Sequence, residues 1–161
     1  MAPALRVFLD SNVLVYAHSA TDHARRERAR ALADLPGAVV STQVLGEIAN
    51  VLLRKFMMDG VEVHARVAEL ARRCDVIPVT TAIVLDAFRV RERYRLGFFD
   101  SQIVAAALAA RAGTLYSEDL HHGLLIDDAL RVVNPFRNRV EQPAARDRVR
   151  PQARVLRKGK S

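Results

Sequence analysis

The sequence predicts an α/β fold, with a mostly parallel central sheet of about five strands flanked by helices. Three observations support this class. The chain has 161 residues, enough for one domain with a core of its own. Hydrophobic residues make up 50% of it, as in globular proteins. Short apolar runs alternate with longer helical segments, which is typical of parallel strands joined through helices.

Each element expected in the first half of the chain has a local signal. The run Leu-Arg-Val-Phe-Leu at 5–9 is typical of a buried strand, and Asp10 or Ser11 after it would cap a short helix. Pro36 and Gly37 end a charged helix because both residues break helices. The elements expected here are a strand at 5–9, helices at 12–18 and 22–35, a strand at 38–41, and helices at 43–57 and 61–74.

The second half continues the alternation. Gly97 and Gly113 each end a helix, and the segment between them is rich in alanine, a strong helix former. Asn134 and Pro135 end the last strand. The elements expected here are a strand at 75–79, helices from about 81 to 94 and at 99–112, strands at 114–117 and 130–133, and a brief extended piece at 124–126.

Charge is distributed unevenly along the chain, whose net charge is +7. Residues 137–161 contain nine arginine and lysine residues and two acidic residues, which leaves residues 1–136 electrically balanced. We therefore expect a compact domain over 1–136 and a basic, flexible tail over 137–161. Basic arms often bind nucleic acid, and a solvated tail without a partner is the alternative.

Two of the expected helices also carry groups of arginine. Their spacing spreads the charges over several helix faces, which favours a solvated surface over a binding groove. The two groups are Arg25, Arg26, Arg28 and Arg30, and Arg89, Arg91, Arg93 and Arg95.

Several classes of protein are disfavoured by composition. The one cysteine, Cys74, excludes an intrachain disulfide, and no Cys/His group has zinc spacing. No apolar run approaches the roughly 18 residues of a membrane span, and the N-terminus lacks the features of a signal peptide. A cytoplasmic protein without membrane contact is the expectation.

Four acidic residues occupy unusual places in this pattern. Asp10 follows the first strand directly, and Asp119 lies two residues past the strand at 114–117, so both belong to the sheet edge where such folds bind ligands. Glu47 and Asp100 lie on the apolar faces of their helices. A charge on an apolar face is costly unless it is paired or bound to a metal.

Each acid also has an ordinary explanation. Asp10 would serve as the N-cap of the helix that follows it, and Asp100, at the start of its own helix, would serve as the N-cap there. Glu47 would pair with Arg54 or Lys55, although both lie beyond the usual reach of four residues. Asp119 would be solvated in a polar loop.

Taken together, the four acids favour a metal site. Several carboxylates in one place repel one another, and a hard divalent cation such as Mg²⁺ or Mn²⁺ relieves that repulsion. A metal-bound water is a better nucleophile, and the metal stabilises charge on a phosphoryl oxygen. The pattern therefore predicts a metal-dependent phosphoryl-transfer or nuclease site.

Four segments share a further pattern: FLDSNVLVYA at 8–17, STQVLGEIANVL at 41–52, GFFDSQIVAAALAARAGTLYSEDL at 97–120 and LRVVNPF at 130–136. They resemble PIN-domain ribonucleases, most closely the VapC-type toxins of bacterial toxin–antitoxin modules. The resemblance covers most of residues 5–136 and implies a Rossmann-like PIN fold with an acidic metal site. The tail from 137 lies outside it.

The resemblance assigns roles to individual residues. It implies that the metal ligands and catalytic acids are Asp10, Glu47, Asp100 and Asp119, with Glu118 at a variable position beside the last. Asn12 would orient Asp10 or a water, and Ser117 would hydrogen-bond within the acidic cluster. The implied reaction is hydrolysis of an RNA phosphodiester by a metal-activated water.

The resemblance also implies partners: an RNA substrate, a cognate antitoxin that covers the groove, and a second copy in a homodimer. A PIN nuclease that processes RNA without a toxin role, and a PIN-like module that binds RNA without cutting it, stay open. A phosphatase of the haloacid-dehalogenase type is disfavoured because Asn12 stands where that class has a second aspartate. A receiver module is disfavoured because Lys55 is the only lysine before the tail.

Overall fold

A computed structural model of the chain describes residues 5–137. Apart from Arg137, the predicted basic tail lies outside these residues. The described elements are β1 (Val7–Leu9), α1 (Ser11–Leu14), the 3₁₀ helix η1 (Val15–His18), α2 (His23–Ala33), β2 (Ala38–Ser41), α3 (Thr42–Arg54), α4 (Gly60–Arg73), β3 (Asp75–Ile77), α5 (Thr81–Tyr94), α6 (Phe98–Ala109), β4 (Thr114–Tyr116), β5 (Leu125–Ile126) and β6 (Leu130–Val133).

One mixed sheet organises the fold, with the strand order β3-β2-β1-β4-β6-β5. All neighbouring strands run parallel except β5, which pairs antiparallel with β6. The predicted α/β class and mostly parallel sheet are confirmed. The described part of the sheet has six strands rather than about five, because the extended piece at 124–126 supplies a short edge strand.

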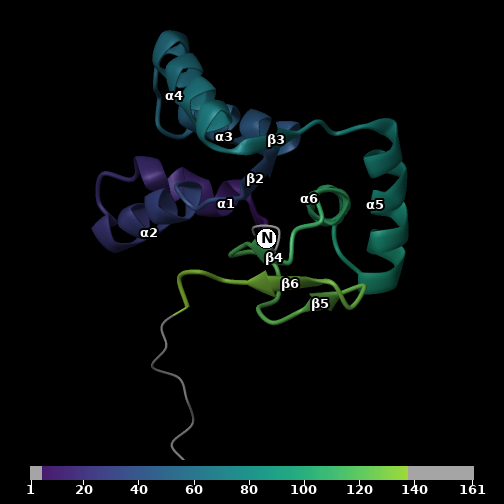
Figure 1. Cartoon of the computed structure of the whole chain (residues 1–161). Helices are drawn as coiled ribbons and strands as arrows, with labels where there is room; N and C mark the ends of the chain where they lie inside the picture. Colours follow the sequence, from purple (N-terminus) through teal and green to yellow (C-terminus); the bar gives the residue numbers. More distant parts are fainter. Residues whose placement is uncertain (1–4, 138–161) are drawn as a thin grey trace, which may run out of the picture.

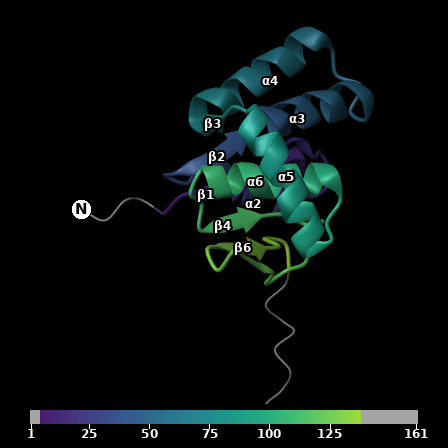
Figure 2. The same ribbon diagram turned by 90° about the vertical axis from the view of Figure 1, so that its right-hand side faces the viewer.

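Helices cover both faces of the sheet (Figures 1 and 2). Figure 1 shows α1 and α2 on one face, and α6 on the other, between the sheet and α5. The pair α3 and α4 lies beyond the β2–β3 end of the sheet. Within the part of the chain that the structure describes, no helix is long and apolar enough to cross a membrane.

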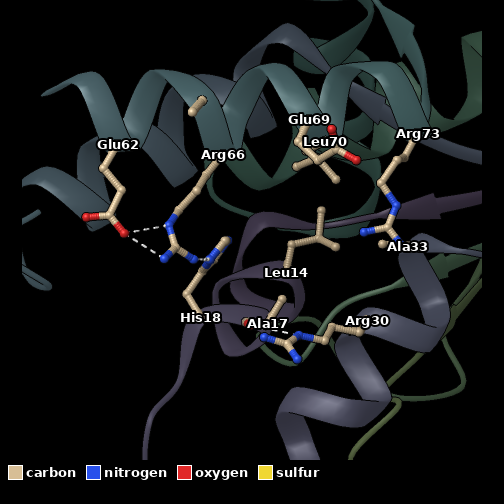
Figure 3. A pocket seen from close by; sticks show the side chains of 11 residues that line it. Leu14, Ala17, His18, Arg30, Ala33, Glu62, Arg66, Glu69, Leu70 and Arg73 are labelled. Atoms are coloured by element: carbon tan, nitrogen blue, oxygen red, sulfur yellow. Dashed lines mark hydrogen bonds and ion pairs between the residues drawn. The ribbon is translucent and has the colours of Figure 1, made fainter.

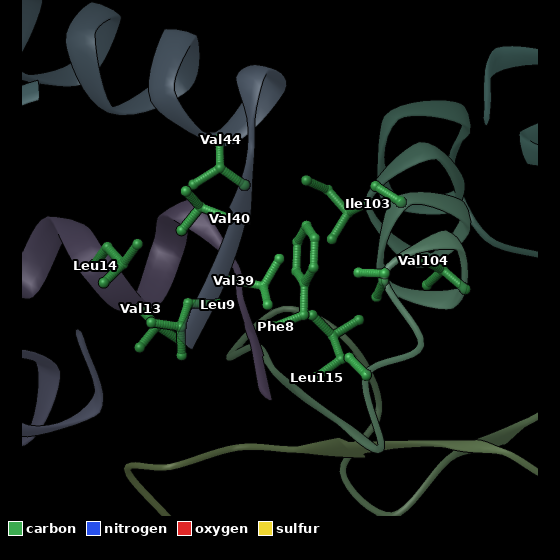
Figure 4. Packing of buried hydrophobic residues seen from close by; sticks show 14 of the residues in the cluster. Phe8, Leu9, Val13, Leu14, Val39, Val40, Val44, Ile103, Val104 and Leu115 are labelled. Carbon is green, nitrogen blue, oxygen red and sulfur yellow. The ribbon is translucent and has the colours of Figure 1, made fainter. Parts of the chain in front are cut away.

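The alternation of side chains along β1 explains why both faces are covered. Phe8 and Leu9 are both 0% exposed, although consecutive residues of a strand point to opposite faces. Figure 4 shows Phe8 toward Val104 of α6 and Leu9 beside Val13 of α1. The sheet is therefore apolar on both sides. The alanine-rich helix α6 fits between it and α5 because small side chains allow close approach.

Two polar contacts fix the β5 edge. Asp127 and Asp128, in the turn between β5 and β6, have φ angles of 48° and 54°, a conformation that aspartate tolerates better than most residues. Asp127 Oδ2 accepts a hydrogen bond from Arg89 Nη2 at 2.8 Å, and Asp127 Oδ1 accepts one from the Tyr94 hydroxyl at 2.9 Å. The hairpin is thereby tied to α5.

Helix boundaries account for most differences from the predicted elements. The helix predicted over 12–18 is α-helical only over Ser11–Leu14 and continues as the 3₁₀ helix η1. The helix predicted over 43–57 ends at Arg54, before Met57 with a positive φ of 54°. The thiol of Cys74 is buried.

Candidate functional site

The sheet register brings two polar turns together at one edge. Leu9 pairs with Tyr116, and Tyr116 with Val133, so the residues that follow β1, β4 and β6 lie in a row. The backbone N–H of Asp10 donates to the carbonyl of Tyr116 at 3.0 Å. Asp10 and the turn after β4 therefore meet at the carboxyl edge of the sheet, as the sequence predicts.

Asp10 is 4% exposed and its carboxylate is hydrogen-bonded on both oxygens. Oδ1 accepts from the Ser11 backbone N–H at 2.7 Å, while Oδ2 accepts from the Ser117 hydroxyl at 2.9 Å and from Asn12 Nδ2 at 3.2 Å. Burial raises the pKa of Asp10 to about 6, against the opposing effect of the bonds from Ser117 and Ser11. The neighbouring carboxylates of Glu47 and Asp100 raise this pKa further.

The helix-cap interpretation of Asp10 is confirmed, because its side chain caps α1. This capping role leaves Asp10 free to take part in the candidate site as well. One carboxylate oxygen caps the helix through Ser11, and the other faces Ser117 and Asn12.

Asn12 joins the two turns. Its Nδ2 donates to Ser117 Oγ at 3.2 Å, and its Oδ1 accepts from the Glu118 backbone N–H at 3.1 Å. Ser117 is 0% exposed, and its hydroxyl also accepts from the Leu120 backbone N–H at 3.4 Å. The hydrogen bonds expected of Asn12 and Ser117 are present, and they fix the position of Asp10.

Glu47 is held by polar side chains. The Ser11 hydroxyl donates to Glu47 Oε2, and Gln43 Nε2 donates to Glu47 Oε1 at 2.8 Å. Within residues 5–137, no ion pair joins Glu47 to Arg54 or Lys55, so the pairing alternative is wrong. Ser11 links the carboxylates of Glu47 and Asp10, because its backbone N–H binds one and its hydroxyl the other.

Two glutamines connect α3 to α6. Gln102 Nε2 donates to Gln43 Oε1 at 2.7 Å, and Gln43 Nε2 also reaches the Phe99 carbonyl at 3.2 Å. Sequence reasoning missed Ser11, Gln43 and Gln102 as site residues. A signal was available for Gln43, which lies one helical turn before Glu47, and for Gln102, a polar residue inside an apolar helix.

Asp100 couples the remaining acids. Burial raises its pKa, and the charges of Asp119 and Glu47 raise it further. It also raises the pKa of Asp10, so Asp100 interacts electrostatically with each of the other three acids. The N-cap interpretation of Asp100 is wrong. Gly97 is the N-cap of α6, and Asp100 lies in the first turn, where the helix dipole favours a negative charge.

The four acidic side chains offer the type of ligand atom that a hard divalent cation binds. Its candidate ligands are carboxylate oxygens, which Mg²⁺ and Mn²⁺ prefer. Within residues 5–137, however, no three His, Cys, Asp or Glu side chains stand close enough together to enclose a metal ion. Binding a cation here would require the carboxylates to draw together.

The neighbouring residue Glu118 points to a different partner. Its Oε1 accepts from Arg25 Nη1 at 2.8 Å, and the same nitrogen donates to the Tyr16 hydroxyl at 2.6 Å. Asp119 is exposed. The turn after β4 thus faces the acidic cluster on one side and α2 on the other.

A comparison with known protein families identifies the fold. Residues 7–134 match the family model of the PIN domain. The chain belongs to the PIN-domain family. The match confirms the resemblance seen in the four sequence segments, and it covers the whole described sheet.

Solved structures with this fold include toxins and toxin–antitoxin complexes. VapC20 of Mycobacterium tuberculosis, described as a sarcin–ricin loop cleaving toxin, is 24% identical over 70% of this chain and 89% of its own, with a TM-score of 0.56. A toxin–antitoxin complex from Klebsiella pneumoniae is 23% identical over 81% of this chain and 98% of that chain, with a TM-score of 0.61. DNA-bound VapBC from Salmonella typhimurium is 17% identical over 80% of this chain and 96% of that chain, with a TM-score of 0.58. No curated protein sequence matches the chain.

This PIN domain has a pocket that none of the four acids lines. A pocket of about 600 Å³ lies between α1, α2 and α4 (Figure 3). Leu14, Ala17 and Leu70 provide apolar lining. At its rim, Arg66 contacts Glu62 at 2.6 Å and His18 Nδ1 at 2.9 Å. Burial and then the charge of Arg66 lower the pKa of His18, which favours the neutral form of this imidazole.

Proposed function

We propose that this PIN domain is a metal-dependent endoribonuclease. The observation that carries the proposal is the buried carboxylate of Asp10, fixed by Ser117 and Asn12 and coupled to Glu47 and Asp100 at the carboxyl edge of the sheet. Such an edge is where parallel α/β sheets bind their ligands. Carboxylates gathered at one edge of a sheet suit a hard cation, which would offset their repulsion when it draws them together.

Under this proposal, Asp10, Glu47, Asp100 and Asp119 hold Mg²⁺ or Mn²⁺, which would activate a water and offset charge on the scissile phosphate. The other polar residues position these acids. Ser117 and Asn12 fix Asp10, while Ser11 and Gln43 hold Glu47. No serine or cysteine nucleophile is required.

We further propose that the chain is the toxin of a VapBC-type pair, acting in the cytoplasm as a homodimer. Support comes from the solved structures of the same fold, which include a toxin and two toxin–antitoxin assemblies. The pocket between α1, α2 and α4 is where a segment of a cognate antitoxin would dock. Its apolar lining and its rim of both charge signs suit an amphipathic peptide.

Cleavage of labelled total RNA tests the nuclease proposal. We expect fragments with Mg²⁺ or Mn²⁺ and none with EDTA. Asp10→Asn should abolish cleavage, whereas the matched control Asp128→Asn should cut like the wild type. Asp128 is exposed and lies in the β5–β6 turn, before the amino end of β6.

If no RNA is cut, two alternatives remain: a nuclease that cuts only a particular RNA, and a module that binds RNA without cutting it. Metal titration separates them. A wild-type chain that is thermally stabilised by Mn²⁺ while Asp10→Asn is not would have the metal site and a narrow choice of RNA. Equal behaviour of both chains would contradict the metal site and favour a module that binds RNA without cutting it.

A further inference from the structure

A pocket of basic and aromatic residues lies beside the acidic edge. Its volume is about 500 Å³, and it lies between α2 and the segment that follows β6. We call it the Arg–Phe pocket. Its lining residues are Asp22, Ala24, Arg25, Arg28, Pro135, Phe136 and Arg137. Figure 1 shows the chain leaving β6 toward the side of the sheet that carries α2.

The strand order places this pocket next to the acids. β4 lies between β1 and β6, and the Ser117 backbone N–H donates to the Val133 carbonyl at 3.0 Å. The segment that contains Phe136 therefore leaves the sheet beside the Ser117–Asp119 turn. Glu118 in this turn binds Arg25 of the pocket through Oε1 and Asn12 through its backbone N–H.

One wall of the pocket is built around Arg25. Its guanidinium carbon lies 4.9 Å from the centre of the Tyr16 ring and 5.2 Å from that of Phe136. The two rings pack edge to face, with centres 4.9 Å apart. Arg25 also contacts Glu118 at 2.8 Å and Asp22 at 3.4 Å. These contacts hold the Arg25 guanidinium and the two aromatic rings in a defined orientation. A ligand that stacks on them would therefore restrict little further side-chain motion.

The charge of the pocket comes from two other arginines. Arg28 and Arg137 are exposed, and neither forms an ion pair with any residue between 5 and 137. Asp22 and Glu118 are both engaged by Arg25, so the pocket keeps an excess of positive charge. Sequence spacing favoured a solvated surface for Arg25 and Arg28, but the fold brings both to one pocket with Phe136.

This combination matches the chemistry of a single-stranded nucleotide. Guanidinium groups bind phosphate through paired hydrogen bonds, and bases stack on aromatic rings and on guanidinium planes. We propose that the Arg–Phe pocket binds one nucleotide of single-stranded RNA next to the scissile phosphate. Arg28 and Arg137 contact its phosphate, and the Phe136–Arg25 wall contacts its base. The inference rests on the proposed nuclease function and names a substrate subsite for it.

Binding of a short, labelled, mixed-sequence single-stranded RNA to the full chain tests the role of the two arginines. EDTA is present, so that cleavage does not interfere. We expect the double variant Arg28→Ala/Arg137→Ala to bind about tenfold more weakly, since hydrogen bonds to charged groups are strong. The slope of log affinity against log salt should fall by about 0.7 for each phosphate that is no longer neutralised.

Arg111→Ala is the matched control. Arg111 is also exposed, but it lies just before β4, at the opposite edge of the sheet. Its removal should change affinity less than twofold. Equal effects of the control and the double variant, or no RNA binding by the wild type, would overturn the proposal.

A second measurement tests the stacking of the base on the pocket wall. The chain has no tryptophan, so Phe136→Trp introduces a single tryptophan into that wall, whose emission can be excited apart from that of the tyrosines. RNA should quench its emission by stacking, and inorganic polyphosphate should not. Polyglutamate serves as a probe for an acidic protein segment. If the double variant no longer binds polyglutamate but still binds RNA, the pocket takes a protein and not RNA.

The two proposals fail separately. Asp10→Asn should bind RNA in EDTA no more weakly than the wild type, because the variant keeps the pocket and loses a negative charge near the phosphate. If Asp10→Asn still cleaves while the double arginine variant binds RNA weakly, the metal site is wrong and the subsite stands. If Asp10→Asn is inactive and the double variant binds RNA normally, the subsite is wrong and the metal site stands.

Discussion

Asp10 and Asp100 lie at the same edge of the sheet, yet the protein holds them in different ways. Asp10 is buried, and Ser11, Asn12 and Ser117 hydrogen-bond its carboxylate. Asp100 is half-buried, and no side-chain hydrogen bond to its carboxylate occurs within the part of the chain that the structure describes. Burial and the charges of Asp119 and Glu47 raise its pKa.

The difference separates a fixed side of the site from a side that is free to adjust. On the β1 side, hydrogen bonds determine the position of the carboxylate, and burial raises its pKa. On the α6 side, burial and then the repulsion from Asp119 and Glu47 raise the pKa of Asp100, and no side-chain hydrogen bond within the described residues restricts the rotation of its carboxylate. If a cation bound at this edge, the carboxylate of Asp10 would already be in position, and the carboxylate of Asp100 would move toward the cation.

The largest expected effect is on cleavage. Asp10→Asn and Asp100→Asn should each lower the rate of RNA cleavage by more than about a hundredfold, because each removes a charged metal ligand. They should differ in stability. Asp100→Asn relieves repulsion without breaking a side-chain hydrogen bond, so its Tm should equal or exceed that of the wild type. Wild-type cleavage by either variant would remove that residue from the site.

The next effect is on stability as a function of pH. The pKa of Asp10 is about 6 in the folded chain against 3.8 for the ordinary group, so the folded state retains a proton that the unfolded state releases. Stability from this group is complete below about pH 4 and is lost as pH rises through about 6, by about 3 kcal/mol in total. Denaturant unfolding of the wild type and of Asp10→Asn in EDTA measures it. A stability difference between them that does not change from pH 4 to 7 would contradict the raised pKa.

A smaller effect is expected from the supports of Asp10. Ser117→Ala leaves one oxygen of a buried carboxylate with fewer donors and should cost about 1–3 kcal/mol of stability. Its cleavage rate should fall by about ten- to a hundredfold, as for other supports of metal ligands. Ser101→Ala is the control, because its hydroxyl is also buried but, among residues 5–137, bonds only to the carbonyl of Gly97, the N-cap of its own helix. Equal losses in both variants would mean that Ser117 has only a packing role.

The smallest effect is expected on the Glu47 side. Gln43→Ala removes the donor to Glu47 and the link to Gln102, and it should weaken Mn²⁺ binding by about tenfold with little change in Tm. Metal titration followed by calorimetry measures this change. Asn50→Ala, an exposed polar position on the same helix, should leave the affinity unchanged. An unaltered affinity in Gln43→Ala would show that Glu47 needs no support.

The sequence was sufficient for most of the fold because its signals are local. Apolar runs, helix breakers and capping residues located the helices and the longer strands. The two residues of β5 escaped assignment as a strand because their pairing depends on the turn at Asp127 and Asp128. Asp100 was misread as a cap because α6 begins at Phe98, which moves Asp100 into the first turn.

The candidate site divides in the same way. Asp10 and Asp119 were predictable from the ends of strands, and Glu47 and Asp100 from their places on apolar helix faces. The contact between Gln43 and Gln102 was not predictable, because it exists only where α3 packs near α6. The same holds for Arg25, Glu118 and Phe136, which come from three separate segments.

The hairpin at the end of the sheet has a consequence for solubility. An exposed strand edge can recruit another chain and start aggregation. Here the outermost strand offers only the two residues Leu125–Ile126, and Arg89 and Tyr94 anchor its turn through Asp127. The free edge of β5 is too short, and its turn too firmly held, for a strand of another molecule to pair with it. The β5 edge of the sheet is therefore protected against pairing with a strand of another molecule.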